Sequence, residues 1–230
     1  MKKKDLRTER ERQRREAYKK IILKAAESVI LYKGLSATTM DDIADEAQFS
    51  KATLYRYFKS KGDIIFEIIA NYLEEMSLRL KEIWEQEKSA RERLRESLIN
   101  VLHFQAEKQN ISRALIMDKS FFKWMHICGA DQDKIVPDMD NKYFQKIKAK
   151  RQKIVNGVCK LLAEGVASGE FRKMDIPAVA FFLESAFEGY FHTQFWQERK
   201  RNLEEDIRVI FPLILQGIEK KGGPNKGEIK

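Results

Sequence analysis

The sequence predicts an all-α protein of about nine or ten helices, and three observations support this fold class. Apolar residues recur at helical spacing along most of the 230 residues. Residues that favour helices, such as Lys, Glu, Leu, Ala and Arg, dominate the composition, and only four prolines occur. No stretch shows the strict polar–apolar alternation that is typical of a strand.

The first helix is predicted to end at about Tyr32, with Gly34 as its C-terminal cap. Residues 1–16 are almost wholly charged, and one interpretation is that they form a solvated, frayed start of this helix. The apolar residues expected on the buried side of the helix are Ile22, Ala25, Ala26, Val29 and Ile30.

Residues 39–61 predict two short helices joined by a tight turn, followed by the start of a third. Thr38 or Thr39 can cap the first helix, because an aspartate lies three residues further on. Ser50 is a good N-cap for the second helix, in which Leu54 faces inward. This is the layout of a helix-turn-helix, whose second helix enters the major groove of DNA. The residues expected to face outward are Lys51, Thr53, Tyr55, Arg56 and Tyr57.

The stretch from Ser50 to Lys61, SKATLYRYFKSK, closely resembles the DNA-binding signature of the TetR family of bacterial transcriptional regulators. The resemblance covers roughly residues 18–66. Two positions depart from the family pattern. Gln48 stands at the turn where glycine is usual and the backbone is left-handed, and Ala52 also replaces a glycine.

The resemblance implies which residues touch DNA. Lys51, Ala52 and Tyr55 are expected at base edges, with Tyr55 packed against a thymine methyl group. The residues expected at phosphates are Thr39, Ser50, Thr53, Tyr57 and Lys61. For Tyr55 and Tyr57, packing within the head stays open as an alternative. Residues 1–16 could also act as a basic arm that touches phosphate or the adjacent minor groove.

The charge distribution agrees with binding to DNA. The formal net charge is +9, and residues 1–62 hold 16 Lys and Arg against 9 Asp and Glu, whereas the rest of the chain is nearly balanced. Two cysteines, Cys128 and Cys159, form no disulfide framework, and no signal peptide or membrane-spanning run is visible. A cytoplasmic location is therefore expected.

The remaining helices are placed by apolar stripes and by stop signals. Gly169 should end one helix, Asp175 and Pro177 should begin the next, and Pro212 should kink the last helix or delay its regular part. The expected helices are 61–87, 90–108, 111–128, 142–168, 177–199 and 203–220, with a loop at 129–141.

Three segments follow from this organisation. Residues 1–62 are expected to form the basic arm and the helix-turn-helix DNA-binding domain. Residues 63–221 are expected to form a larger helical domain for ligand binding and dimerisation. Residues 222–230 are expected to be a disordered tail.

The larger domain is rich in aromatic and methionine residues, which could line a cavity for a hydrophobic ligand or simply form core. The candidate ligand-binding residues are Met117, Phe121, Phe122, Trp124, Met125, Phe144, Phe187, Tyr190 and Phe191. The resemblance implies a four-helix dimer interface from the last two helices, with intramolecular packing as the alternative. Its candidate residues are Phe182, Ser185, Ala186, Gly189, Ile207, Ile210, Phe211, Ile214 and Ile218.

Catalytic and metal chemistry is not expected. No phosphate-cradling glycine loop, nucleophile elbow or paired zinc motif occurs, and His126 and Cys128 near Asp131 or Asp133 make a weak metal pattern. No cofactor is expected. The sequence thus favours a dimeric regulator, most simply a repressor, that binds a palindromic operator and is released by a hydrophobic or amphipathic effector. The alternative is a DNA-bound structural or protein-interaction factor with the same head.

Overall fold

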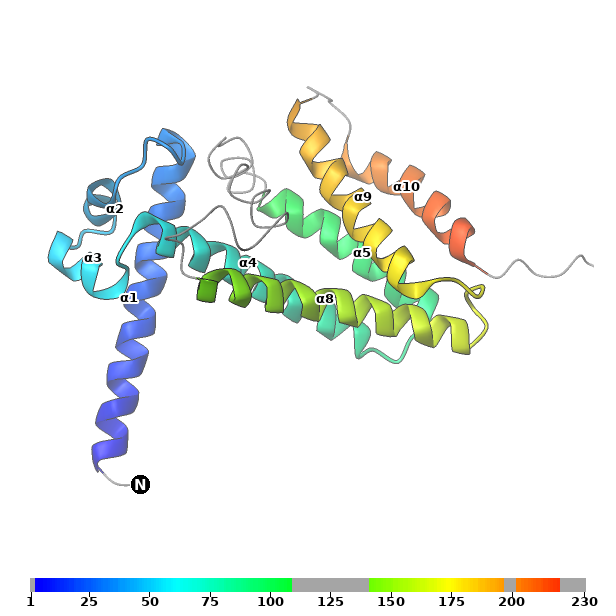
Figure 1. Ribbon diagram of the computed structural model, residues 1–230, viewed down its shortest axis with the longest axis horizontal. Coiled ribbons are helices and arrows are strands. Elements are labelled where there is room, and N and C mark those ends of the chain that lie inside the picture. The colour runs from blue at the N-terminus through cyan, green and yellow to red at the C-terminus, as the bar shows by residue number, and fades with distance from the viewer. Residues whose placement is uncertain (1–2, 109–140, 197–201, 220–230) are drawn as a thin grey trace, which may run out of the picture. The chain divides into compact units, whose positions relative to one another are not determined.

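The computed structural model describes residues 3–108, 141–196 and 202–219, which form helices and connecting turns (Figure 1). An all-α fold is therefore confirmed. The described residues contain eight helices, namely α1 (Lys3–Lys33), α2 (Met40–Glu46), α3 (Lys51–Tyr57), α4 (Lys61–Trp84), α5 (Ala90–Glu107), α8 (Asn141–Ala167), α9 (Ile176–Trp196) and α10 (Leu203–Ile218). The helix predicted at 111–128 lies outside the described residues, as does the predicted loop at 129–141 except for Asn141, which begins α8.

The chain divides into two compact units. The first unit consists of residues 1–72 and 108–147, and the second consists of residues 73–107 and 148–230. Helices α4 and α8 contribute residues to both units.

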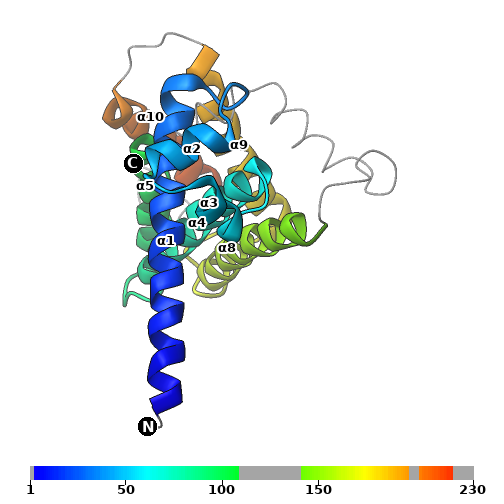
Figure 2. The same cartoon turned by 90° about the vertical axis from the view of Figure 1, so that its left-hand side faces the viewer.

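The core of the first unit joins α1, α2, α3 and the start of α4. Its fully buried side chains are Ile22, Ala26, Ile30, Ile43, Ala44, Leu54 and Ile64. Helix α2 packs on α1 and on α3. Helix α1 continues toward its N-terminus well beyond the part that packs on α2 and α3 (Figure 2). The predicted frayed start is thus helical from Lys3.

Local capping interactions shape the helix-turn-helix as the sequence predicts. Thr39 and Asp42 form a reciprocal capping box, in which the N–H of Asp42 donates to the Thr39 hydroxyl and the N–H of Thr39 donates to the Asp42 carboxylate. The hydroxyl of Ser50 accepts from the N–H of Thr53 at the start of α3. In the turn, Gln48 adopts the left-handed conformation with φ of 55°.

The core of the second unit consists of leucines of α5 and α8 together with apolar residues of α9 and α10. Its buried residues include Leu94, Leu98, Leu102, Leu161, Leu162, Phe171, Ala180, Ile207, Phe211 and Leu215. Helix α5 packs on α10. The Trp84 ring lies against Gly157 of α8, and its indole N–H donates to the Ser97 hydroxyl at 3.0 Å.

Most predicted helix ends are confirmed. Gly34 and Gly169 follow α1 and α8 with φ of 81° and 80°, in the region that glycine adopts most easily. The carboxylate of Asp175 accepts from the N–H of Ala178 and caps α9. Helix α10 continues through the exposed Pro212, so the predicted delay of its regular part is wrong.

Candidate nucleic-acid interface

Helix α3 presents a polar, solvent-exposed face. Lys51, Ala52, Tyr55 and Arg56 are exposed, and 51% of the Tyr55 surface is accessible. Leu54, on the opposite side of the helix, is fully buried in the core of the first unit. The face that the sequence predicts at base edges is therefore available to a macromolecular partner.

An ion pair connects this face to α2. The ammonium group of Lys51 lies 2.6 Å from the carboxylate of Asp41. Both side chains are mostly exposed, so formation of the ion pair removes little water from either charge. The pKa of Lys51 is raised by the hydrogen bond and the charge of Asp41. A contact of Lys51 with DNA would therefore require it to give up this internal partner.

Three of the four hydroxyl groups expected at phosphates, those of Thr39, Ser50 and Thr53, are engaged in local capping. The Thr39 hydroxyl donates to the Asp42 carboxylate at 2.7 Å while it accepts from the Asp42 N–H. The Ser50 and Thr53 hydroxyls lie 2.9 Å apart. These groups fix the starts of α2 and α3, so contact with phosphate would be added to a structural role.

Tyr57 differs from Tyr55 in its surroundings. Its ring is half-buried against the core of the first unit and lies 5.8 Å from the Tyr18 ring in an edge-on arrangement. Tyr18 also lies 5.0 Å from the Phe49 ring in the turn. Tyr57 therefore packs within the head, where Tyr18 of α1 is its aromatic neighbour. Tyr55, in contrast, stays exposed.

Lys61 also differs from its expected role. Its ammonium group donates to the backbone carbonyls of Leu35 and Thr38 at 2.8 Å each, and to that of Ser36 at 3.4 Å. These three acceptors use the three donors of the ammonium group. Lys61 therefore ties the start of α4 to the loop between α1 and α2, and the phosphate contact expected for it would require the ammonium group to leave these carbonyls.

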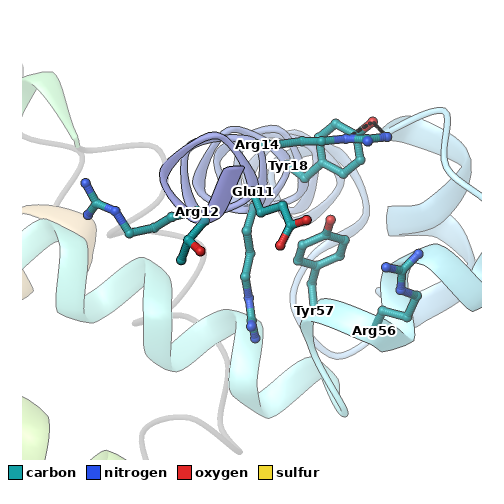
Figure 3. Close-up of a pocket in the computed structure, with 8 residues that line it drawn as sticks. Glu11, Arg12, Arg14, Tyr18, Arg56 and Tyr57 are labelled. Atoms are coloured by element: carbon teal, nitrogen blue, oxygen red, sulfur yellow. Dashed lines mark hydrogen bonds between the residues drawn. The ribbon is translucent and has the colours of Figure 1, made fainter. Parts of the chain in front are cut away.

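The structure forms a basic groove between α1 and α3, which the sequence indicated only through the basic arm expected at residues 1–16. The groove has a volume of about 730 Å³. Its lining residues are Thr8, Glu11, Arg12, Arg14, Arg15, Tyr18, Arg56 and Tyr57. In Figure 3 the Tyr57 ring rises from α3 toward the face of α1 that carries Glu11 and Tyr18.

Of the candidate ligand-binding residues, only Phe187 and Tyr190 have described side chains. Both pack against the core of the second unit, and the Tyr190 hydroxyl donates to the buried Asp206 carboxylate at 2.6 Å. Met117, Phe121, Phe122, Trp124 and Met125 lie outside the described residues, as do the side chains of Phe144 and Phe191. His126, Cys128, Asp131 and Asp133 also lie outside them.

The candidate dimer residues divide into two groups. On α9, the residues that face solvent are Phe182, Ser185, Ala186 and Gly189. On α10, Ile207, Phe211 and Ile218 are 7%, 4% and 7% exposed and belong to the core of the second unit, while Ile210 and Ile214 are half-buried. Within the single chain, Ile207, Phe211 and Ile218 therefore pack in the core, as the intramolecular alternative expects. The apolar residues that α10 does expose are Val209 and Leu213.

In the part of the chain that the structure describes, no group of three or more His, Cys, Asp or Glu side chains could hold a metal ion. Within the same residues, none of the helices combines the length and apolar character needed to cross a membrane.

The fold and the exposed α3 face define a helix-turn-helix DNA-binding regulator. The model of bacterial regulatory proteins of the TetR family matches residues 22–68, which include α2, α3 and the start of α4. This match shows that the chain carries a DNA-binding domain of the TetR family of transcriptional regulators.

Similarity to known regulators extends beyond the matched domain. The uncharacterized HTH-type transcriptional regulator YhgD of Bacillus subtilis is 27% identical over 165 residues, which are 72% of this chain and 78% of that protein. The transcriptional repressor KstR2 of Mycolicibacterium smegmatis is 28% identical over 163 residues, which are 70% and 72% of the two chains. The structure of the regulator FadR from Bacillus subtilis in complex with stearoyl-CoA has the same fold, with a TM-score of 0.68 at 20% identity over 86% of this chain and 98% of that one.

Proposed function

We propose that this protein is a repressor that binds a palindromic operator as a homodimer and is released by a hydrophobic or amphipathic small molecule. The observation that carries the proposal is the exposed face of α3, with Lys51 and Tyr55 outside the core, in a domain that matches a family of DNA-binding regulators. The related repressor KstR2 supports repression as the mode of action. The protein would act in the cytoplasm, where DNA is accessible.

In this proposal residues 1–62 are the DNA-binding domain. Lys51, Ala52 and Tyr55 meet base edges, because they lie on the exposed face near the start and middle of α3. Thr39, Ser50 and Thr53 lie at the helix starts and contact phosphates from there. Tyr57 and Lys61 support the head through internal contacts.

Dimerisation is proposed through the exposed apolar face of α9 and the outer face of α10. Phe181 and Phe182 are 68% and 67% exposed, and a protein seldom leaves two adjacent aromatic rings in water without a partner. Ala186 and Gly189 lie further along α9 and permit close approach of a second helix. A twofold dimer would place two α3 helices on two half-sites of a palindrome.

The effector is proposed to bind among the aromatic and methionine residues of the 63–221 domain. The support is compositional, together with the position of Phe187 and Tyr190 in the core of the second unit. The effector can release DNA only if it binds more tightly to the arrangement of heads that fits the operator poorly. Stearoyl-CoA, the ligand of the similarly folded FadR, is a suitable first probe.

The first test is selection of bound sequences from a random duplex pool with the purified protein at moderate salt. Enrichment of a palindrome with two half-sites is expected, because two α3 helices related by a twofold axis would read it. Tyr55→Ala should enrich no motif while it keeps its melting temperature, since Tyr55 is exposed and holds no core position. Salt-sensitive binding by the unaltered protein without any enriched motif would refute the proposed regulator function.

A further inference from the structure

We propose that the basic groove between α1 and α3 holds the sugar–phosphate backbone of the DNA that flanks the half-site. This inference rests on the proposed function, because it requires that α3 be seated in the major groove. The arm of α1 that precedes Tyr18 would then add affinity that does not depend on sequence.

The charge of the groove fits a polyanion. Four arginines line it against one glutamate, which leaves a surplus of three positive charges. The glutamate, Glu11, is already paired with Arg7 at 3.2 Å, and Arg12 is paired with Glu9 at 2.8 Å. No ion pair to Arg15 or Arg56 occurs among the described residues, and both side chains are exposed. These two guanidinium groups can therefore each donate hydrogen bonds to a phosphate, which the planar fork of arginine donors fits well.

The position of the groove selects DNA as the partner. Arg56 directly follows Tyr55, so the groove begins beside the face that is proposed to meet bases. The arm rises about 1.5 Å per residue, so it extends about 17 Å from Tyr18 back to Arg7. Phosphates of one strand are spaced about 3.4 Å apart along the duplex axis and wind around it, so a straight arm of this length can reach more than one of them.

The arm is held in place before DNA binds. Tyr18 contacts both Phe49 and Tyr57, so its ring fixes the direction of α1 relative to the turn and to α3. The guanidinium group of Arg14 lies 5.3 Å from the centre of the Tyr18 ring and donates to the Tyr18 hydroxyl at 3.1 Å. A pre-ordered arm loses less conformational entropy on binding than a disordered tail would.

Arg15→Gln tests the groove, and Arg10→Gln is the matched control, because Arg10 is exposed on the same arm but does not line the groove. Affinity is measured for the duplex selected by the unaltered protein, both with long flanks and trimmed to its half-sites. Arg15→Gln should lower the slope of log affinity against log salt by about 0.9 on the flanked duplex. The resulting loss of affinity should be about three- to fourfold larger at 50 mM than at 200 mM salt.

Arg56→Gln should reproduce the effect, while Arg10→Gln should bind the flanked duplex like the unaltered protein. Equal losses for Arg15→Gln and Arg10→Gln would overturn the groove, since they would show a general effect of net charge. Unchanged binding by Arg15→Gln, or an equal loss on the trimmed duplex, would also overturn it. If the unaltered protein enriches no motif, the proposed function fails, and the comparison of salt slopes on a random duplex still decides whether the groove binds phosphate.

Discussion

The ammonium group of Lys51 and the carboxylate of Asp41 lie 2.6 Å apart, so α2 and α3 share an ion pair on the face proposed to meet DNA. An exposed pair of this kind contributes little to stability, because water screens both charges. Its position matters more than its strength, because Lys51 must leave Asp41 before it can reach a base. The acid therefore competes with DNA for the lysine.

Asp41→Asn should raise the affinity for DNA roughly two- to fivefold, the factor that corresponds to the loss of an exposed ion pair. Fluorescence anisotropy with a labelled duplex at fixed salt measures the change. Asp45→Asn is the control, because Asp45 is an exposed acid of the same helix that makes no hydrogen bond to Lys51 in the described structure. An equal gain in both variants would show that only the net charge matters.

Lys61→Met should destabilise the protein without changing the salt dependence of DNA binding. The ammonium group of Lys61 is bound to three carbonyls, and hydrogen bonds to a charged group are worth roughly 1.5–3 kcal/mol each before the compensating hydration of the freed carbonyls. A net loss of about 1–2 kcal/mol in the free energy of unfolding is expected from urea titration. Lys59→Met, at an exposed position two residues earlier, should leave stability unchanged. If Lys61→Met instead lowers the slope of log affinity against log salt by about one, Lys61 does contact a phosphate.

Acid should weaken the capping box at the start of α2. Hydrogen bonds from Lys33 and Thr39 lower the pKa of Asp42 from 3.8 to about 2. The depressed pKa means that the contribution of Asp42 to stability is fully present above about pH 4 and is lost as the pH falls through about 2. Unfolding measured by circular dichroism between pH 5 and 2 should show this loss, and Asp42→Asn should flatten that part of the curve. A profile unchanged by Asp42→Asn would contradict the assignment.

Gly157→Ala should destabilise the second unit. A Cβ atom at Gly157 would lie 1.9 Å from the Trp84 ring, so the ring or the helix must move, at a typical cost of about 1–3 kcal/mol. Gly217→Ala is the control, because Gly217 lies in the exposed face of α10 with no atom near its Cβ position. That change should stabilise the helix by about 0.5–1 kcal/mol. Differential scanning calorimetry should therefore show a lower melting temperature for Gly157→Ala and a higher one for Gly217→Ala than for the unaltered protein.

Phe182→Ser should convert the proposed dimer into a monomer. The side chain is mostly exposed in the single chain, so its removal costs that chain little, whereas a dimer interface would lose a buried aromatic ring worth about 2 kcal/mol or more. Sedimentation velocity measures the molecular mass in solution. Leu78→Ser removes an exposed apolar side chain of α4 and should leave the mass unchanged. A dimer that persists in Phe182→Ser would exclude this face of α9.

Features governed by neighbours in the chain could be predicted from the sequence. Thr39, Ser50 and Asp175 cap helices, and Gly34 and Gly169 end them, because capping depends on a side chain or a φ angle within a few residues. The apolar spacing also predicted that Leu54 is buried. The left-handed Gln48 shows that the turn imposes its geometry on a residue that adopts it less readily than glycine.

The sequence by itself determined the helical fold, the helix-turn-helix and the concentration of positive charge near the N-terminus. The tertiary structure decided which groups remain available for function. Tyr57 packs beside Tyr18, Lys61 binds the carbonyls of a loop more than 20 residues earlier, and Phe211 lies in the core. Periodicity identifies the apolar face of a helix, but the partner of that face is set by segments distant in the chain. For the same reason, the groove between α1 and α3 exists only once the two helices are packed.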